Sequence, residues 1–260
     1  MKIAVSGKGG VGKTTISASL ARLFADRGYQ VLAIDADPDS NLAYALGISP
    51  EEAAQALPIS RASDLIQERT GAKPGESGGM FKLNPKVEDI PERMCIEDNG
   101  IKLLVLGAIE KGGQGCICPQ STLLKSLVSH VVLRRQEMVL LDMEAGIEHL
   151  GRGTARGVDA LIVVVDPDRQ SVQTARTIDQ LARETGIQKV FLILNRIRSP
   201  EEEGILREQL SGYEILGILR DSDEVRRASL GGNKVLEADP GFAEQVQALL
   251  KNLEERLESQ

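Results

Sequence analysis

Short apolar runs recur along the chain, and each leads into a loop. They lie at residues 3–5, 31–34, 103–106, 139–141, 161–165, 190–194 and about 213–219. Helix-like segments follow most of them, and two helices are expected after the last. The run Leu161 to Val165 lacks polar alternation, which is typical of a strand buried on both faces. The pattern predicts one α/β domain over 1–260, with a mostly parallel sheet and helices on both faces.

Two segments depart from this alternation. Residues 71–91 contain repeated glycine and proline, which predicts a surface excursion. Residues 107–118 contain closely spaced glycines and two cysteines, and are predicted to form a metal-binding loop. The closing residues 251–260 are rich in glutamate, so this part is expected to end a polar helix and not to anchor the chain in a membrane.

Composition narrows the classes of function. Of the 260 residues 42% are hydrophobic, enough for a buried core, and no apolar run is long enough to span a bilayer. The net charge of -7 argues against broad nucleic-acid binding, which depends on lysine and arginine. Because three cysteines are too few for a disulfide scaffold and no signal-peptide profile is present, we expect a cytoplasmic protein with no membrane or nucleic-acid partner.

The segment after the first strand is typical of a phosphate-binding loop. It reads GKGGVGKTT from Gly7 to Thr15 and runs into a helical pattern. Glycines allow backbone N–H groups to surround a phosphate, Lys13 adds positive charge and the Thr14 hydroxyl can ligate Mg²⁺. A generic glycine-rich turn is disfavoured because strand, loop, Gly-Lys-Thr and helix follow in order. The predicted nucleotide contacts here are Gly9, Gly10, Val11, Gly12, Lys13, Thr14 and Thr15.

The sequence KGGVGKTT resembles the deviant Walker A motif of the family that includes the MinD and ParA ATPases and the nitrogenase iron protein. The resemblance implies a P-loop fold, binding of ATP and ADP with Mg²⁺, ATP hydrolysis and a nucleotide-gated homodimer. It implies catalytic roles for Lys13 and for Lys8. Lys8 matches the early lysine of the motif, which in this family reaches across the dimer interface to the partner's ATP.

Acidic residues at two strand ends extend the resemblance. It implies that Asp35 is a carboxylate on the Mg²⁺ side and that Asp37 is catalytic and orients the attacking water. Asp142 ends a further apolar strand, resembles the Walker B residue and is expected to hold a Mg²⁺-bound water, with Gly146 allowing the next loop to move. A bare Asp-x-Asp at a strand end also occurs as a helix cap or turn.

A third resemblance concerns the nucleotide base. Asn195 and Arg196 follow a strand and resemble the pair that recognises adenine, because an asparagine amide both donates and accepts hydrogen bonds. The segment Leu219 to Asp221 resembles the loop that closes over the base. The alternative is that Asn195 is only a polar residue ending a strand.

The remaining chemistry is in the Cys-x-Cys pair. Proline at position 119 predicts a helix start that places the Cys118 thiol at the helix N-terminus, where a thiolate is favoured. Two thiolates cannot complete a metal shell, but Cys116 and Cys118 from two chains give four, for nickel or zinc shared across a dimer. The pair could instead be incidental. We expect Cys95 to be structural and His149 to be a solvated or capping residue, with a ligand or sensor role as the alternative.

Within the wider family, the Cys-x-Cys pair and the stretch DMEAGIEH at 142–149 resemble CooC-type maturation ATPases. This implies nickel insertion into carbon monoxide dehydrogenase, with the apoenzyme as client. MinD-like, ParA-like and nitrogenase-type members fit less well, because the chain lacks a basic C-terminal helix, a basic net charge and a cysteine after Asp142. Two alternatives stay open: an iron–sulfur carrier or electron donor, and a MinD- or ParA-like regulatory ATPase with incidental cysteines.

Overall fold

A central sheet organises the molecule. The computed structural model describes residues 1–74, 80–107, 118–135, 137–146 and 152–258. The strands of this sheet are β1 Lys2–Gly7, β2 Val31–Ala36, β3 Ile96–Asp98, β4 Ile101–Val105, β5 Met138–Met143, β6 Ala160–Val165, β7 Val190–Ile197 and β8 Glu214–Arg220. Their order is β3-β4-β2-β5-β1-β6-β7-β8, and every neighbouring pair is parallel except β3 with β4.

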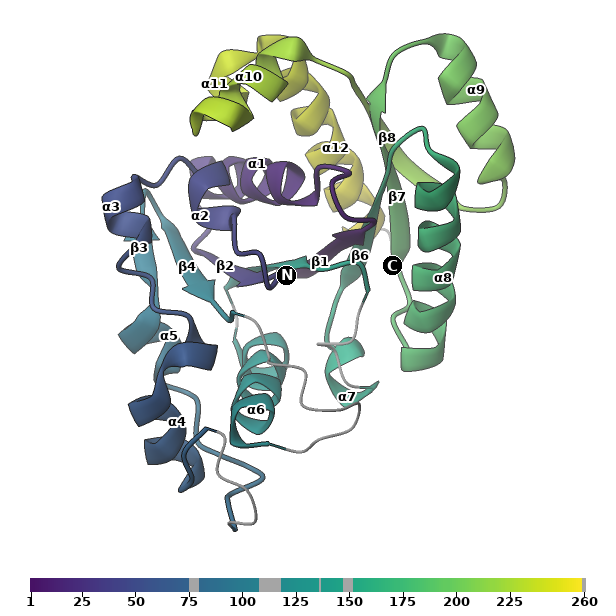
Figure 1. Cartoon of the computed structure of the whole chain (residues 1–260). Coiled ribbons are helices and arrows are strands. Elements are labelled where there is room, and N and C mark those ends of the chain that lie inside the picture. The colour runs from purple at the N-terminus through teal and green to yellow at the C-terminus, as the bar shows by residue number, and fades with distance from the viewer. Residues whose placement is uncertain (75–79, 108–117, 136, 147–151, 259–260) are drawn as a thin grey trace.

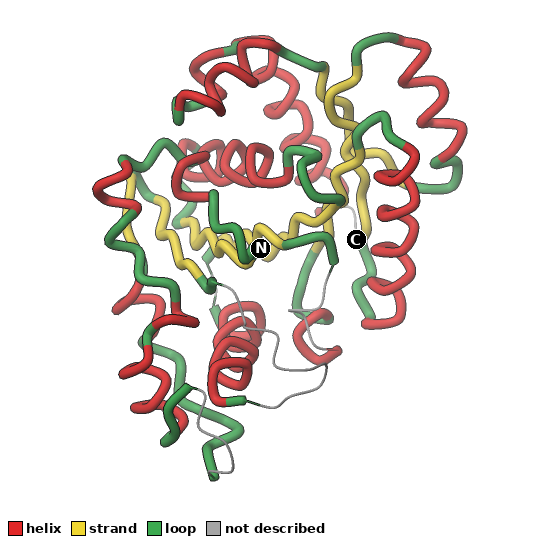
Figure 2. Tube along the Cα trace, viewed as in Figure 1, coloured by secondary structure: helices red, strands yellow, loops and turns green. Residues whose placement is uncertain are grey.

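Helices cover both faces of the sheet (Figure 1). The first layer consists of α1 Lys13–Asp26, α2 Leu42–Ala45, α3 Pro50–Ala53, α10 Asp223–Gly231, α11 Val235–Ala238 and α12 Pro240–Glu258. The second consists of η1 Ile59–Arg61, α4 Ser63–Thr70, α5 Ile90–Met94, α6 Pro119–Arg134, α7 Arg152–Ala155, α8 Arg169–Thr185 and α9 Pro200–Gln209. Figure 2 shows the strands as a middle layer between these two sets of helices.

The strands contribute to an apolar core on each side. Ile3 and Val5 of β1 face the layer of α1 and α12, whereas Ala4 between them faces the layer of α6 and α8. All six residues of β6 are buried, as expected for a strand covered on both faces. The predicted α/β fold with a mostly parallel sheet is therefore confirmed.

Some elements differ from the sequence-based expectation. The edge strand β3 was not predicted, because three residues reading IED carry too little pattern. Between α4 and α5, the described residues 71–74 and 80–89 contain neither helix nor strand, yet Val87 there is buried in the core. Three helices follow β8 instead of two, since the four-residue α11 separates α10 from α12.

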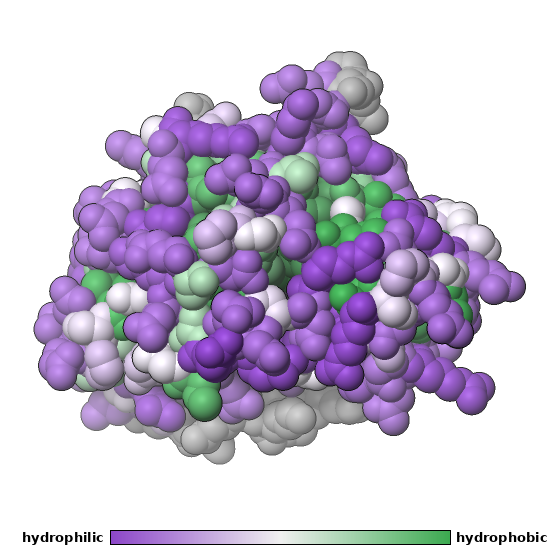
Figure 3. All heavy atoms as spheres, turned by 90° about the horizontal axis from the view of Figure 1, so that it is seen from above, coloured by the Kyte–Doolittle hydropathy of each residue, from purple (hydrophilic) through white to green (hydrophobic). Residues whose placement is uncertain are grey.

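Strand order determines where a ligand can bind. β1 lies between β5 and β6. The strands β2 to β5 all lie on one side of β1, and the strands β6 to β8 all lie on the other side. In open parallel sheets the crevice at the carboxyl ends of such strands is the usual ligand site. The face seen from above is mostly hydrophilic, with smaller apolar areas between polar side chains (Figure 3). Among the described residues no helix is long and apolar enough to cross a membrane.

Candidate functional site

The glycine-rich loop connects the carboxyl end of β1 to α1. Gly10 and Gly12 have φ angles of 82° and 98°, which side-chain-bearing residues rarely adopt. α1 begins at Lys13, and no side chain caps the N–H groups of its first turn. These groups are therefore available to an anion, and the helix dipole favours one there.

Two residues at the end of β7 hold this loop. Asn195 Nδ2 donates a hydrogen bond to the carbonyl of Val11 at 2.7 Å, and Arg196 Nη1 donates to the carbonyl of Gly10 at 2.7 Å. A Cβ at Gly12 would lie 2.5 Å from Asn195 Nδ2, so glycine is required for this approach. The structure thus places the predicted base-binding pair directly on the predicted phosphate loop.

A small cavity of about 120 Å³ opens beside this contact. It is bounded by Gly12 and Thr15, by Asn195 and Arg196, and by residues of β8, of α10 and of the segment between them, which includes Asp221. Asp221 accepts hydrogen bonds from Arg198 at 2.9 Å and from Arg226 at 2.9 Å, which ties the segment after β7 to α10 beside the cavity. Recognition of adenine by Asn195 and Arg196 stays a prediction, with one amide hydrogen of Asn195 already engaged by Val11.

Two buried carboxylates lie next to each other at the ends of β2 and β5. Asp35 and Asp142 are register partners, and each is 1% exposed. Asp35 accepts hydrogen bonds from the backbone N–H of Asp37 at 3.2 Å and of Leu42 at 3.0 Å. Asp142 Oδ1 accepts from the Ser17 hydroxyl at 2.9 Å, while its buried Oδ2 has no hydrogen-bond partner among the described residues.

Burial dominates the electrostatics of this pair. Desolvation raises the pKa of Asp35 to about 7 and that of Asp142 to about 6. The Asp142 charge raises the pKa of Asp35 further, whereas nearby hydroxyl groups and Lys13 oppose the shift at Asp142. Oxygen ligands are those that Mg²⁺ prefers, and the unpartnered Asp142 Oδ2 leaves an acceptor for one of its water ligands. The residues present therefore fit a magnesium ion beside Thr14.

Lys13 and Asp37 both lie close enough to Asp142 to influence its pKa. Lys13 is 6% exposed, and its Nζ donates to the carbonyl of Lys8 at 3.4 Å. Asp37 follows β2, is partly exposed, and accepts a hydrogen bond from the N–H of Asp39 at 3.0 Å. The carboxylate of Asp37 contributes to the pKa shifts of both Asp35 and Asp142, so the predicted hydrolytic residue lies at the same edge of the sheet.

Lys8 has an intrachain partner that the sequence did not reveal. Its ammonium donates a hydrogen bond to Asp168, which also caps α8 by accepting from the Ser171 N–H at 3.3 Å. This pairing raises the pKa of Lys8 and lowers the pKa of Asp168. The reach of Lys8 to a second subunit stays a prediction, and it requires that this ion pair opens.

Ser6 is a second residue that sequence reasoning missed. The hydroxyl of this fully buried residue lies 2.9 Å from the carbonyls of Glu144 and Gly146 and accepts from the Gly146 N–H at 3.1 Å. It joins the end of β1 to the segment after β5. The one available signal was a polar residue at the end of an otherwise apolar strand.

The cysteine motif is only partly described. Cys118 is the N-cap of α6, has extended backbone geometry and accepts a hydrogen bond at Sγ from the Ser121 N–H at 3.4 Å. Cys116, most of the predicted metal-binding loop and His149 lie outside the described residues. No group of three or more potential metal ligands occurs in the described parts of the chain. Burial raises the pKa of Cys95 to about 12, which fits a structural thiol.

Comparison with known proteins places these features in context. The model for the CobQ/CobB/MinD/ParA nucleotide binding domain matches residues 2–235. The carbon monoxide dehydrogenase accessory protein CooC of Rhodospirillum rubrum is 44% identical over 99% of this chain and 97% of its own. An uncharacterized ATP-binding protein of Methanocaldococcus jannaschii is 43% identical, over 96% of each chain.

Among solved structures, the MinC:MinD cell division protein complex of Aquifex aeolicus is similar with a TM-score of 0.69 and 21% identity. The match covers 97% of this chain and 94% of the other. At this identity the likeness concerns the fold, which agrees with the sheet and helix layers described above.

Proposed function

The chain belongs to the CobQ/CobB/MinD/ParA nucleotide-binding family, and from that premise we propose that it is an ATP-hydrolysing metallochaperone that assists nickel insertion into carbon monoxide dehydrogenase. The observation that carries the proposal is 44% identity to the CooC accessory protein over nearly the whole chain. The position of Cys118 at the start of α6 supports it, because the thiol accepts a backbone N–H there and the helix N-terminus favours a thiolate.

The ATP site of the proposal uses the loop and the neighbouring strand ends. Backbone N–H groups from Gly9 to Thr15 and the Lys13 ammonium bind the phosphates. Thr14, Asp35 and Asp142 hold Mg²⁺, which neutralises phosphate charge when bound. Asp37 orients the attacking water, and it lies close enough to both buried carboxylates to influence their pKa values.

Dimerisation has two roles in the proposal. Lys8 leaves Asp168 and contacts the ATP of the partner chain, so hydrolysis depends on the dimer. Cys116 and Cys118 from both chains supply four thiolates for one nickel ion, the cargo, and zinc competes for the same ligands. Since the complete metal site exists only in the dimer, metal binding favours dimerisation by mass action. Thiolates must lose protons to bind, so metal affinity falls as pH falls.

The experiment measures metal content, oligomeric state and activation of apo carbon monoxide dehydrogenase by nickel, all on the same anaerobic preparations. The wild type is compared with a Cys116→Ser/Cys118→Ser double variant and with Cys95→Ser as the matched control. We expect about one nickel ion per two wild-type and control chains, and loss of nickel binding and of client activation in the double variant.

Other results would contradict the proposal in distinguishable ways. Binding of one nickel ion per chain by a monomer would exclude a metal site that is shared by two chains. A brown protein with visible absorption that depends on both cysteines identifies an iron–sulfur carrier instead. Full client activation by the double variant makes the cysteines incidental and favours a regulatory ATPase.

A further inference from the structure

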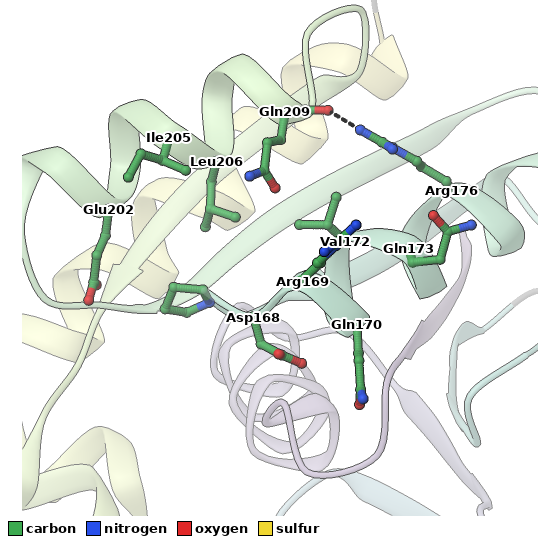
Figure 4. A pocket seen from close by; sticks show the side chains of 11 residues that line it. Asp168, Arg169, Gln170, Val172, Gln173, Arg176, Glu202, Ile205, Leu206 and Gln209 are labelled. Carbon is green, nitrogen blue, oxygen red and sulfur yellow. Dashed lines mark hydrogen bonds between the residues drawn. The ribbon is translucent and has the colours of Figure 1, made fainter.

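A groove separates α8 from α9 on the side of the sheet opposite α1. Its volume is about 620 Å³, and Figure 4 shows side chains of both helices lining it. Val172 of α8 and Leu206 of α9 form an apolar floor and are 4% and 3% exposed. Ile205 at the rim is 49% exposed, so its aliphatic side chain is available for contact.

The two ends of the groove differ. At one end Arg176 Nη2 donates to the carbonyl of Gln209 at 2.7 Å, so the helices are joined there (Figure 4). At the other end the groove reaches Asp168, the residue that pairs with Lys8. A ligand in the groove therefore lies beside the ion pair that must open for Lys8 to act on a second subunit.

The charged side chains along the groove differ in whether they have a hydrogen-bond or ion-pair partner. The Glu202 carboxylate accepts a hydrogen bond from the Arg198 N–H at 2.8 Å at the start of its own helix, and Asp168 is paired with Lys8. The guanidinium of Arg169 is exposed and has no hydrogen-bond or ion-pair partner in the described parts of the chain. Glu202 keeps its negative charge, but the guanidiniums of Arg169 and Arg176 outnumber it and Asp168 is balanced by Lys8. The groove therefore carries a net positive charge, although the net charge of the chain is -7.

We propose that this groove docks an acidic segment of the client enzyme, with apolar side chains covering Ile205 and a carboxylate pairing with Arg169. The proposal rests on the proposed function, since the occupant is the client. Charge complementarity supports it, because an acidic segment finds an unpaired guanidinium beside an apolar floor.

The test uses the full chain and purified apo carbon monoxide dehydrogenase. Arg169→Glu and Ile205→Asp change exposed groove residues, and Leu230→Asp, at a position that is 91% exposed on α10, is the matched control. Binding is measured by titration calorimetry, and ATP affinity is measured on the same preparations. We expect both groove variants to bind the client about tenfold or more weakly, with unchanged ATP affinity, and the control to behave as the wild type. Salt should weaken wild-type binding more than Arg169→Glu binding.

The outcomes separate the two proposals. If the wild type does not bind the apoenzyme, the proposed function fails and the docking site fails with it. If the wild type binds and the groove variants bind equally well, only the docking site is wrong. If the variants change self-association and leave client binding intact, a second copy occupies the groove and the client assignment is overturned.

Discussion

Asp35 lies directly opposite Asp142 on the neighbouring strand, and both carboxylates are buried. Desolvation by burial is the main reason that each carboxylate resists ionisation, and the charge of Asp142 adds to this effect at Asp35. The nucleotide-free protein therefore keeps a destabilising charge in its site, which Mg²⁺ and nucleotide are expected to compensate.

Asp142→Asn should stabilise the nucleotide-free protein at pH 8. Burial raises the pKa of Asp142 to about 6 in the folded chain, so the folded state binds the carboxyl proton more tightly than the unfolded state does. The stability that this proton provides is fully present when the pH is below the pKa of about 4 that an aspartate has in the unfolded chain. That contribution is lost as pH rises through about 6. At pH 8 the variant should gain about 1–3 kcal/mol in free energy of unfolding, and near pH 4 the gain should vanish. Denaturant unfolding at both pH values checks this, and an equal effect at both would contradict it.

Asp168→Asn should lower the protein concentration needed for ATP-dependent dimerisation. Asparagine caps a helix about as well as aspartate, so α8 is retained, while Lys8 loses its charged partner. Because both side chains are partly exposed, the change in the dimerisation constant should stay below about tenfold. Analytical ultracentrifugation with ATP measures it. Lys8→Ala is a control with the opposite expected effect: it should abolish the ATP-dependent dimer, while the monomer should still bind ATP.

Gly12→Ala should weaken ATP binding about tenfold or more. The new Cβ meets Asn195 Nδ2 at 2.5 Å on a backbone with φ of 98°, so either the loop or Asn195 must move. Gly204→Ala, in α9, is the matched control, because a Cβ there meets no atom within 4 Å beyond its neighbours in the chain and helix. Fluorescent nucleotide titration compares the three proteins. Wild-type affinity in Gly12→Ala would show that the contact with Asn195 does not position the loop.

Asp37→Ala should slow ATP hydrolysis about a hundredfold or more and let ATP-bound dimers accumulate. The phosphate-binding residues are untouched, and in the described structure the Asp37 carboxylate accepts a hydrogen bond only from the nearby Asp39 N–H. Single-turnover hydrolysis and light scattering measure the two effects. Hydrolysis at the wild-type rate would remove Asp37 from the catalytic step.

Local patterns predicted the sheet and the phosphate loop because each is encoded in consecutive residues. The strand that contains Asp142 and the loop from Gly7 to Thr15 are recognisable from short stretches, and parallel strands bring their carboxyl ends to one edge. Asp35 and Asp142 lie beside each other because both are near the carboxyl ends of neighbouring parallel strands.

Contacts between distant segments were not predictable in the same way. Asp168 is 160 residues from Lys8, and nothing local to either distinguishes an ion pair from a solvated charge. The hydroxyl of Ser6 reaches Gly146 only because β1 and β5 are neighbours in the sheet. The amide of Asn195 was predicted to face a base, but its preference for the Val11 carbonyl depends on how closely Gly12 approaches.

The hydrogen bonds from Asn195 and Arg196 to consecutive loop carbonyls have a kinetic consequence. A loop already held open loses little conformational entropy when ATP arrives, so binding needs no slow rearrangement of the backbone. The association rate should then be limited by diffusion and by the narrowness of the cavity. If the base occupies the cavity as we propose, we expect the lifetime of the bound nucleotide to depend on how often the hydrogen bond from Arg226 of α10 to Asp221 opens.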